Sequence, residues 1–453
     1  MAYANKKSLG GAIKGTLILS VGGLVTKVIG ALYRIPLTNI LGTEGLGIYQ
    51  TVFPLYTILL TFSSTGVPAA IAKTVASSDG DGKDVLKSSL SLFLPIGTIG
   101  FLLMAAFSMP ISAWQGEPNA FYAYLALSPS VALVAAISCI RGYFQGKKNM
   151  APTALSQIIE QSVKLVFGLG LCLLFPAKPF LSAALATLAV TISEAAALIY
   201  LFLKFHSCEN LTTTSKKYPV KRLIAIVIPI TLSAILLPVA RVYDSFTIVN
   251  FLSAYTDNAT SLYGIYTGGV ESLIGVPVAV CYGVAAAFLP AISSLIKNGE
   301  SQEANKRAGQ ALILTFLLSA LAAAAVYILA EPCVKILYPK LDFFEQNTTI
   351  RLLKAAAVNI AFISLLQTET SCLIAFERPY VPCLLLGTGL LVKIILQPFL
   401  LKIPEINIFA ALISDILCYF VAVFGNLVYI IIYTNKNFLK ESAYENHLGR
   451  NRN

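Results

Sequence analysis

The chain has 453 residues, of which 57% are hydrophobic and 12% are charged, and its mean hydropathy is +0.76. A soluble domain carries roughly 25% charged residues, so this composition excludes an ordinary soluble protein and indicates a chain that needs lipid as its solvent. The formal charge of +11 is therefore interpreted as membrane topology, and a nucleic-acid partner is not expected.

Twelve stretches are apolar enough to cross a bilayer, for which about 20 residues suffice. The first contains Lys27 and Arg34, is too long for a signal peptide and lacks a small-residue cleavage site, so it is interpreted as a retained helix. The stretches lie near residues 10–38, 44–73, 86–113, 120–145, 150–175, 180–205, 221–252, 262–293, 308–332, 352–376, 380–402 and 406–434. The prediction is an all-α integral membrane protein of about twelve transmembrane helices, with membrane lipids around it.

The basic residues between these stretches are distributed unevenly. With the N-terminus placed inside, 22 of the 33 Lys and Arg residues fall on the cytoplasmic side, six on the opposite side and five within helices. Cytoplasmic loops carry an excess of Lys and Arg. The distribution therefore predicts that both termini are cytoplasmic.

An internal repeat suggests how the helices are organised. The tripeptide Gly-Ile-Tyr occurs at 47–49 and again 217 residues later at 264–266, and the pairs Gly66-Val67 and Gly283-Val284 match at the same offset. This offset carries the second helix onto the eighth, which predicts two pseudo-symmetric six-helix lobes of parallel orientation. The predicted domains are the lobe 1–206, a cytoplasmic linker 207–222, the lobe 223–436 and a cytoplasmic tail 437–453.

Ionisable residues recur inside the predicted helices, where each costs about 2.5–3.5 kcal/mol on insertion scales. Lys27 and Arg34 share one polar stripe, and residues 157, 160, 161 and 164 form a polar face on which Glu160 and Lys164 are close enough to pair. The further candidates are Glu194, Arg241, Asp244, Glu271 and Glu369. For any one of these charges, pairing between helices is as good an explanation as a cavity. Their number and their distribution over both lobes favour a water-accessible cavity between the lobes.

Several kinds of chemistry are excluded by the remaining residues. The eight cysteines form no C-x-x-C pair, and the two histidines, His206 and His447, lie outside the predicted helices. A metal site or a histidine-based catalytic site is therefore not expected. The run GYFQGKK from Gly142 lacks the spacing and the Ser or Thr of a phosphate-binding loop, so ATP binding is not expected either.

Several segments resemble a known family. They are TKVIGALYRIPLTNILGTEGLGIYQ from Thr26, TGVPAAIAK from Thr65, RGYFQGKKNMAPTALSQIIEQ from Arg141 and YGIYTGGVESLIGVPVAVCYGVAAAFLPAIS from Tyr263. They are similar to the stage V sporulation protein B branch of the multidrug/oligosaccharidyl-lipid/polysaccharide exporter superfamily, close to the lipid II flippases. The resemblance implies two six-helix lobes of the MOP/MATE type around a cavity that opens alternately to each side of a bacterial plasma membrane.

The resemblance also bears on single residues. Lipid II flippases carry a Ser-Arg-x-x-Gly-x-x-Arg pattern in the first helix, which Thr26, Lys27 and Gly30 match in place and Arg34 matches one residue late. Asp244 lies where those proteins have an acid in the seventh helix. The Arg expected early in the eighth helix is absent, and Glu271 is nearby instead, which implies a different substrate headgroup.

The expected function is a flippase or exporter of an undecaprenyl-pyrophosphate-linked oligosaccharide, a peptidoglycan precursor for spore cortex or cell wall, acting as a monomer and not as an enzyme. Lys27, Arg34 and Arg241 are expected to bind the diphosphate. Glu160, Lys164, Glu194, Asp244, Glu271 and Glu369 are expected to line the cavity or to couple transport to the membrane potential, H⁺ or Na⁺ without a cofactor.

Two alternatives stay open. In a drug/cation antiporter of the same superfamily, Asp244, Glu271 and Glu369 would form a cation site and the basic residues would be structural. A membrane glycosyltransferase or polymerase is disfavoured because the longest external connection, near residues 338–350, is short.

Overall fold

The computed structural model describes residues 2–61, 66–77, 82–175, 178–208 and 220–450, and for some residues inside these ranges, Lys27 among them, it describes the backbone alone. Within these ranges the chain is helical almost throughout and contains no strand, which confirms the predicted all-α class. The chain forms two compact units, Met1–Gly268 and Gly269–Asn453, here called the N-terminal and the C-terminal unit.

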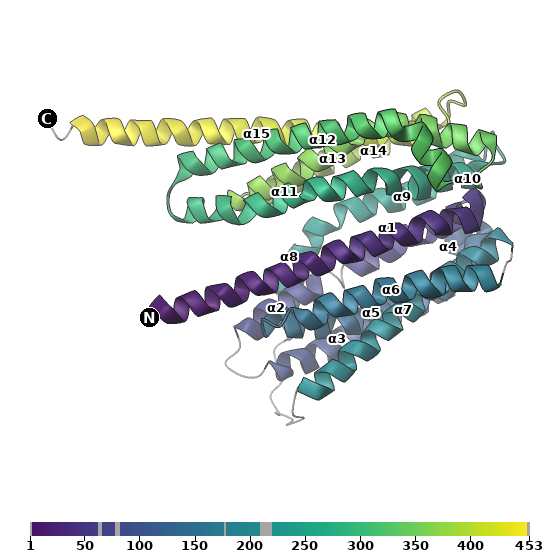
Figure 1. Cartoon of the computed structure of the whole chain (residues 1–453), viewed down its shortest axis with the longest axis horizontal. Coiled ribbons are helices and arrows are strands. Elements are labelled where there is room, and N and C mark those ends of the chain that lie inside the picture. The colour runs from purple at the N-terminus through teal and green to yellow at the C-terminus, as the bar shows by residue number, and fades with distance from the viewer. Residues whose placement is uncertain (1, 62–65, 78–81, 176–177, 209–219, 451–453) are drawn as a thin grey trace. The chain divides into compact units, whose positions relative to one another are not determined.

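The N-terminal unit contains ten α-helices in the part of the chain that the structure describes (Figure 1). They are α1 (Ala2–Thr61), α2 (Val67–Ala76), α3 (Lys83–Ala106), α4 (Ser108–Trp114), α5 (Phe121–Gly146), α6 (Ala151–Leu174), α7 (Pro179–Cys208), α8 (Val220–Ala234), α9 (Leu236–Leu252) and α10 (Ala259–Tyr263). A 3-10 turn, η2 (Pro118–Ala120), precedes α5, and a π-helical segment, η3 (Gly264–Val270), follows α10.

Helix α1 consists of two helices that meet at Gly42. This glycine has φ 67° and ψ 179°, a conformation that is disfavoured for residues with a Cβ atom. The break falls between the first two predicted stretches, 10–38 and 44–73. Within the second stretch the structure describes α1 as far as Thr61 and α2 from Val67, with Pro68 in the first turn of α2, where proline is well tolerated.

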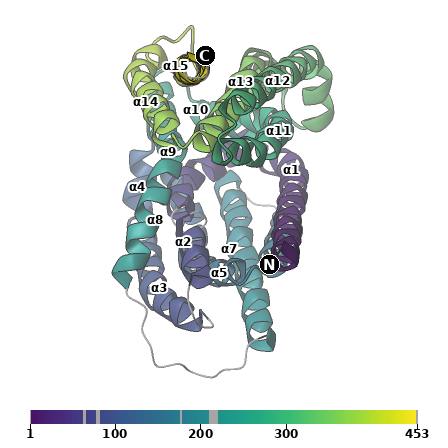
Figure 2. The ribbon, with the colours of Figure 1, turned by 90° about the vertical axis from the view of Figure 1, so that its left-hand side faces the viewer.

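Helix α5 is the most enclosed helix of the N-terminal unit and packs against α2, α3 and α7 (Figure 2). Helix α6 packs against α1 and α7. The apolar core between these helices includes Tyr33, Ile48, Tyr124 and Leu127, each at most 1% exposed. Burial of these large side chains fixes the spacing of α1, α5, α6 and α7, the helices that supply most of the candidate site.

The two copies of the Gly-Ile-Tyr repeat contact each other, since α1 packs against α10 and the turn that follows it. A Cβ atom on Gly264 would lie 2.6 Å from the backbone nitrogen of Gly47, and one on Gly47 would lie 2.0 Å from the carbonyl oxygen of Thr260. Only glycine allows backbones to approach so closely. The repeat therefore marks a helix contact, whereas the superposition of two six-helix lobes stays a prediction.

The C-terminal unit contains five long helices in its described part: α11 (Glu271–Lys297), α12 (Ser301–Leu337), α13 (Phe343–Ala375), α14 (Tyr380–Leu401) and α15 (Phe409–Arg450). Helix α13 packs against α11, α12 and α15, and α14 packs against α15. Helix α13 starts with a capping box, in which the Asp342 carboxylate accepts a hydrogen bond from the Glu345 amide at 2.7 Å and the Glu345 carboxylate accepts one from the Asp342 amide at 3.0 Å.

Nine helical segments in the described part of the chain are long and apolar enough to cross a membrane. They match the predicted stretches from 86–113 to 180–205 and from 262–293 to 406–434. Large apolar side chains on their outer faces, such as Leu321 at 70% and Ile328 at 72% exposure, are suited to lipid and not to water. The stretch 10–38 corresponds to the part of α1 before Gly42, the stretch 44–73 to the later part of α1 with α2, and the stretch 221–252 to α8 with α9. The count of twelve transmembrane helices stays a prediction.

The N-terminal unit extends further along the chain than the predicted first lobe. Helices α9 and α10, which the prediction assigns to the second lobe, pack against α1. Most of the predicted linker, residues 209–219, lies outside the described residues. The lobe boundaries and the sidedness of the termini therefore stay predictions.

Candidate functional site

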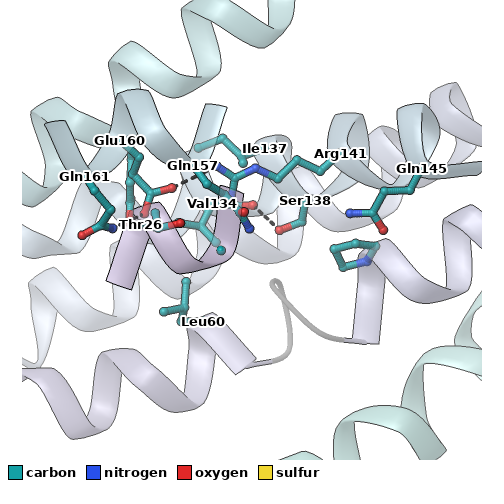
Figure 3. A pocket seen from close by; sticks show the side chains of 13 residues that line it. Thr26, Leu60, Val134, Ile137, Ser138, Arg141, Gln145, Gln157, Glu160 and Gln161 are labelled. Carbon is teal, nitrogen blue, oxygen red and sulfur yellow. Dashed lines mark hydrogen bonds and ion pairs between the residues drawn. The ribbon is translucent and has the colours of Figure 1, made fainter. Parts of the chain in front are cut away.

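A cavity of about 330 Å³ lies within the N-terminal unit (Figure 3). Its lining comes from α1, α2, α5, α6 and α7, so it is enclosed by helices that are distant in sequence. Helix α5 contributes Ser138, Arg141 and Gln145, which share one helix face at spacings of three and four residues. Polar side chains at this depth of an apolar bundle require partners or water.

Helix α6 contributes Gln157, Glu160 and Gln161, three of the four residues of the polar face that the sequence predicts. In Figure 3, Glu160 and Gln161 lie at one end of the cavity and Gln145 lies at the other. These three residues line a cavity within the N-terminal unit, whereas the cavity between the two lobes stays a prediction.

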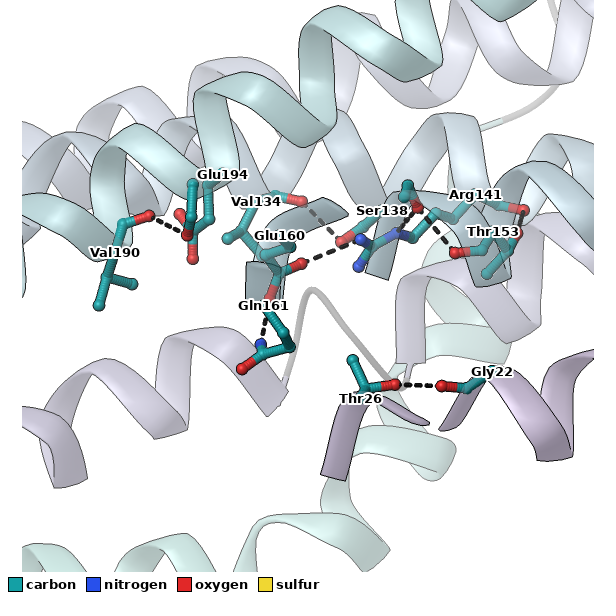
Figure 4. Close-up of polar contacts among 12 residues, drawn as sticks. Gly22, Thr26, Val134, Ser138, Arg141, Thr153, Glu160, Gln161, Val190 and Glu194 are labelled. Carbon is teal, nitrogen blue, oxygen red and sulfur yellow. Dashed lines mark hydrogen bonds and ion pairs between the residues drawn. The ribbon is translucent and has the colours of Figure 1, made fainter. Parts of the chain in front are cut away.

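The central ion pair of the cavity joins α5 to α6. The Arg141 Nη2 atom lies 3.0 Å from Glu160 Oε2, and the two side chains are 13% and 23% exposed. Arg141 Nε also donates to the Ser156 hydroxyl at 2.9 Å, while Gln161 Nε2 donates to Glu160 Oε1 at 3.1 Å (Figure 4). Both charges are therefore held by several hydrogen bonds, which keep them oriented at the cavity wall.

The predicted pair of Glu160 with Lys164 does not form. The Lys164 ammonium lies 5.7 Å from the centre of the Tyr33 ring, a cation–π arrangement with α1. Spacing of four residues on one helix allows a pair, but the guanidinium of Arg141 supplies a planar fork from the neighbouring helix and takes its place. Arg141 lies within the predicted stretch 120–145 but was not among the predicted site residues; the structure places it in α5 at the cavity.

Glu194 of α7 also lines the cavity. Its Oε1 atom accepts a hydrogen bond from the Tyr56 hydroxyl of α1, and the residue is 3% exposed. Its Oε2 atom has no hydrogen-bond partner in the described part of the chain. An unpartnered carboxylate oxygen in a buried cavity marks a position where a proton, a cation or a ligand hydroxyl can bind.

The three predicted diphosphate-binding residues lie in two helices of the N-terminal unit. Arg34 is exposed on α1, next to Tyr33 and within electrostatic range of Lys164. Arg241 is exposed on α9. Lys27 lies in α1, but its side chain is outside the described part. None of the three is among the described lining residues of the cavity, whose only cation is Arg141.

The remaining predicted acids are not gathered in the cavity. Asp244 is buried in α9 at 5% exposure, and Glu271 is half-buried at the start of α11. Glu369 is 1% exposed in α13, and its Oε2 atom has no partner within the described ranges. Nor do the described residues contain a group of three or more His, Cys, Asp or Glu side chains arranged to hold a metal ion.

A second intramembrane ion pair, in the C-terminal unit, was not predicted. Lys393 Nζ of α14 lies 2.5 Å from Asp415 Oδ1 of α15, and the side chains are 1% and 8% exposed. A Cβ atom on Gly389, one turn before Lys393, would lie 2.3 Å from the Cys418 carbonyl oxygen. Close approach of α14 and α15 therefore places this pair in a dry helix contact.

These features define a multi-pass membrane protein with a polar, partly charged cavity among its helices. The family model described as "Polysaccharide biosynthesis protein" matches residues 12–296. The chain belongs to this polysaccharide biosynthesis family. The predicted family is thereby confirmed.

Curated relatives extend this assignment. The chain is 29% identical to stage V sporulation protein B of Bacillus subtilis over 346 residues, covering 72% of the chain and 66% of that protein. It is 24% identical to the lipid II flippase MurJ of the same bacterium, covering 87% of the chain and 78% of the flippase. The chain thus spans about two thirds of the first relative's length. Activities named among these relatives are those of flippases and not of enzymes.

Solved structures of two kinds share the fold. An inward-facing multidrug resistance MATE family transporter of the MOP superfamily matches with a TM-score of 0.77 and 13% identity, over 93% of this chain and 98% of that one. The lipid II flippase MurJ in an inward closed conformation matches with a TM-score of 0.72 and 16% identity, over 94% and 93%. At these identities the likeness establishes a MATE/MurJ-like fold.

Proposed function

We propose that the protein is a flippase for an undecaprenyl-pyrophosphate-linked oligosaccharide, a peptidoglycan precursor of the lipid II type used for spore cortex or cell wall. The observation that carries the proposal is the cavity in the N-terminal unit, where an ion pair and amide side chains are available among membrane-crossing helices. A polar headgroup cannot cross hydrocarbon unaided, and such a lining replaces its water. No bond is made or broken; the protein acts by alternating access.

The diphosphate is assigned to basic residues outside the cavity lining. Arg141 is already neutralised by Glu160 at 3.0 Å and is therefore a weak receptor for a further anion. Arg34, Lys27 and Arg241 stay the proposed diphosphate ligands, since guanidinium and ammonium groups form charge-assisted hydrogen bonds with phosphate oxygens.

Coupling to the membrane potential, H⁺ or Na⁺ is part of the proposal. The Oε2 atoms of Glu194 and Glu369, which have no hydrogen-bond partner among the described residues, are the candidate positions for a proton or a cation. Both residues are at most 3% exposed, so a change in their charge would alter the stability of the surrounding helices strongly. Such a change could bias one conformation over another.

A drug/cation antiporter is the second candidate. It is supported by the fold shared with a MATE transporter and by the buried Glu369, which lies beside Asn426 of α15. In this alternative Asp244, Glu271 and Glu369 would serve the cation. The antiporter hypothesis gives the exposed Arg34 and Arg241 only a structural role, whereas the flippase hypothesis uses them to bind the diphosphate.

Complementation separates the two candidates. Cells depleted of their lipid II flippase should grow when this protein is expressed, while their resistance to cationic drugs stays unchanged. Drug resistance without rescue would favour the antiporter. The matched control is Glu331→Ala on the exposed surface of α12, which should rescue as well as the unchanged protein.

A further inference from the structure

The described lining of the cavity in the N-terminal unit has polar groups but little positive charge. It contains one cation, Arg141, and two carboxylates, Glu160 and Glu194. The charges of Arg141 and Glu160 cancel in their ion pair, so these described residues offer no net positive charge to an anion. A diphosphate in this cavity would lie close to carboxylates, which is unfavourable in a medium of low dielectric constant.

The unused hydrogen-bonding groups of the cavity are mostly amides. The side chains of Gln145 and Gln157, here called the amide pair, make no hydrogen bond within the described part of the chain and face the cavity (Figure 3). An amide donates and accepts hydrogen bonds at once, as a sugar hydroxyl does. The Oε2 atom of Glu194 adds a strong acceptor. This is a lining suited to neutral hydroxyl groups.

Positive charge is found just beyond one end of the cavity. Lys164 follows Gln161 and Glu160 by about one turn of α6, or roughly 5 Å along the helix axis. Its ammonium lies over the ring of Tyr33, and Arg34 is the next residue of α1 and within electrostatic range. We call Arg34 and Lys164 the basic rim. One helical turn between the rim and the cavity is comparable with the width of a sugar ring.

We infer that the cavity holds the saccharide part of a lipid-linked diphosphate sugar, with the amide pair bound to sugar hydroxyls and the basic rim bound to the diphosphate. The inference rests on the proposed function and divides the substrate between two neighbouring subsites. A volume of about 330 Å³ is near the lower end of small-ligand pockets, which suits one or two sugar rings and not the whole headgroup.

Binding to two probes that share the lipid diphosphate but differ in the rest of the headgroup tests this division. The full-length protein in nanodiscs is titrated with lipid II and with undecaprenyl diphosphate, which lacks the disaccharide and the peptide attached to it. The unchanged protein should bind lipid II about tenfold or more tightly than undecaprenyl diphosphate, because hydrogen bonds to the sugar are added. The double variant Gln145→Met, Gln157→Met should lose about tenfold in lipid II affinity and keep its affinity for undecaprenyl diphosphate.

Two control variants complete the design. Arg34→Ala should weaken both lipids by the same factor, and Gln310→Met, at an exposed position of α12, should change neither. Thermal unfolding of each variant verifies that it is folded. Equal binding of both lipids by the unchanged protein, or an equal loss of both in the amide-pair variant, would overturn the two-subsite inference. Binding of neither lipid would contradict the proposed function itself.

Discussion

The two units each hold an ion pair among membrane helices, and the pairs differ in access. Arg141 and Glu160 are 13% and 23% exposed at a cavity wall, whereas Lys393 and Asp415 are 1% and 8% exposed in a helix contact. Water or a ligand can compete for the first pair but not for the second. The comparison indicates that an ion pair stays open to competition at a cavity wall in the N-terminal unit, whereas in the C-terminal unit an ion pair of the same kind joins two closely packed helices.

The largest loss of stability is expected at the Lys393–Asp415 pair, which is shielded from water. Asp415→Ala leaves the Lys393 ammonium buried without its carboxylate, which should lower the free energy of unfolding by about 3–5 kcal/mol. Thermal unfolding of the purified protein and its amount in the membrane measure this. The double variant Lys393→Met, Asp415→Leu should recover most of the stability, because an apolar pair of similar volume needs no desolvation.

A matched control for this variant is present on the protein surface. Lys335 and Glu331 form a 2.7 Å pair whose side chains are 59% and 54% exposed. Glu331→Ala should leave the unfolding temperature unchanged, since exposed pairs contribute little. If Asp415→Ala were as stable as Glu331→Ala, the structural role of the dry pair would be wrong.

A smaller loss of stability is expected at the cavity wall. Arg141→Ala removes hydrogen bonds to Glu160 and Ser156, and we expect about 1–3 kcal/mol because cavity water can solvate the carboxylate that is left. Transport should nevertheless be lost, because the Glu160 carboxylate then adds an uncompensated negative charge to the cavity that the anionic lipid has to enter. Unfolding temperature and rescue of flippase-depleted cells are compared in the same variant; a stability loss as large as that of Asp415→Ala would remove the distinction between the pairs.

The smallest loss of stability is expected at the exposed cations. Arg34→Ala and Arg241→Ala should reach the membrane in near-normal amounts, because both side chains are exposed in the structure. Both should abolish flipping if they bind the diphosphate, and Arg34→Lys should keep part of the activity, since it preserves charge but loses the bidentate fork. Quantitation of membrane protein beside cell rescue checks this. Full rescue by both alanine variants would exclude the diphosphate assignment.

The periodicity of the sequence correctly predicted which residues share a face, because that relation depends on the geometry of one helix alone. The spacing of Gln157, Glu160 and Gln161 placed them on one face of α6 because helix geometry fixes that relation locally. Hydropathy likewise located the nine long spans. The choice of ion-pair partner depends on which helices pack together, and the Arg141–Glu160 and Lys393–Asp415 pairs join residues 19 and 22 positions apart. Charge spacing on one helix cannot supply that information.

Arg141 could have been found from a weaker signal. Ser138, Arg141 and Gln145 repeat at helical spacing within the predicted stretch 120–145, as the polar residues of α6 do, but no role was predicted for the arginine. Its partner, Glu160, lies on another helix. The packing of α5 against its neighbours, which the sequence does not give, therefore decides that Arg141 belongs to the site.

Translocation of fluorescent lipid II across vesicles that contain the purified protein tests the central claim, that the cavity of the N-terminal unit is the route of a lipid-linked saccharide. The unchanged protein and the Lys393→Met, Asp415→Leu variant should both translocate the lipid. Arg141→Ala should not, although its unfolding temperature identifies it as folded. Translocation by Arg141→Ala at the rate of the unchanged protein would contradict the claim.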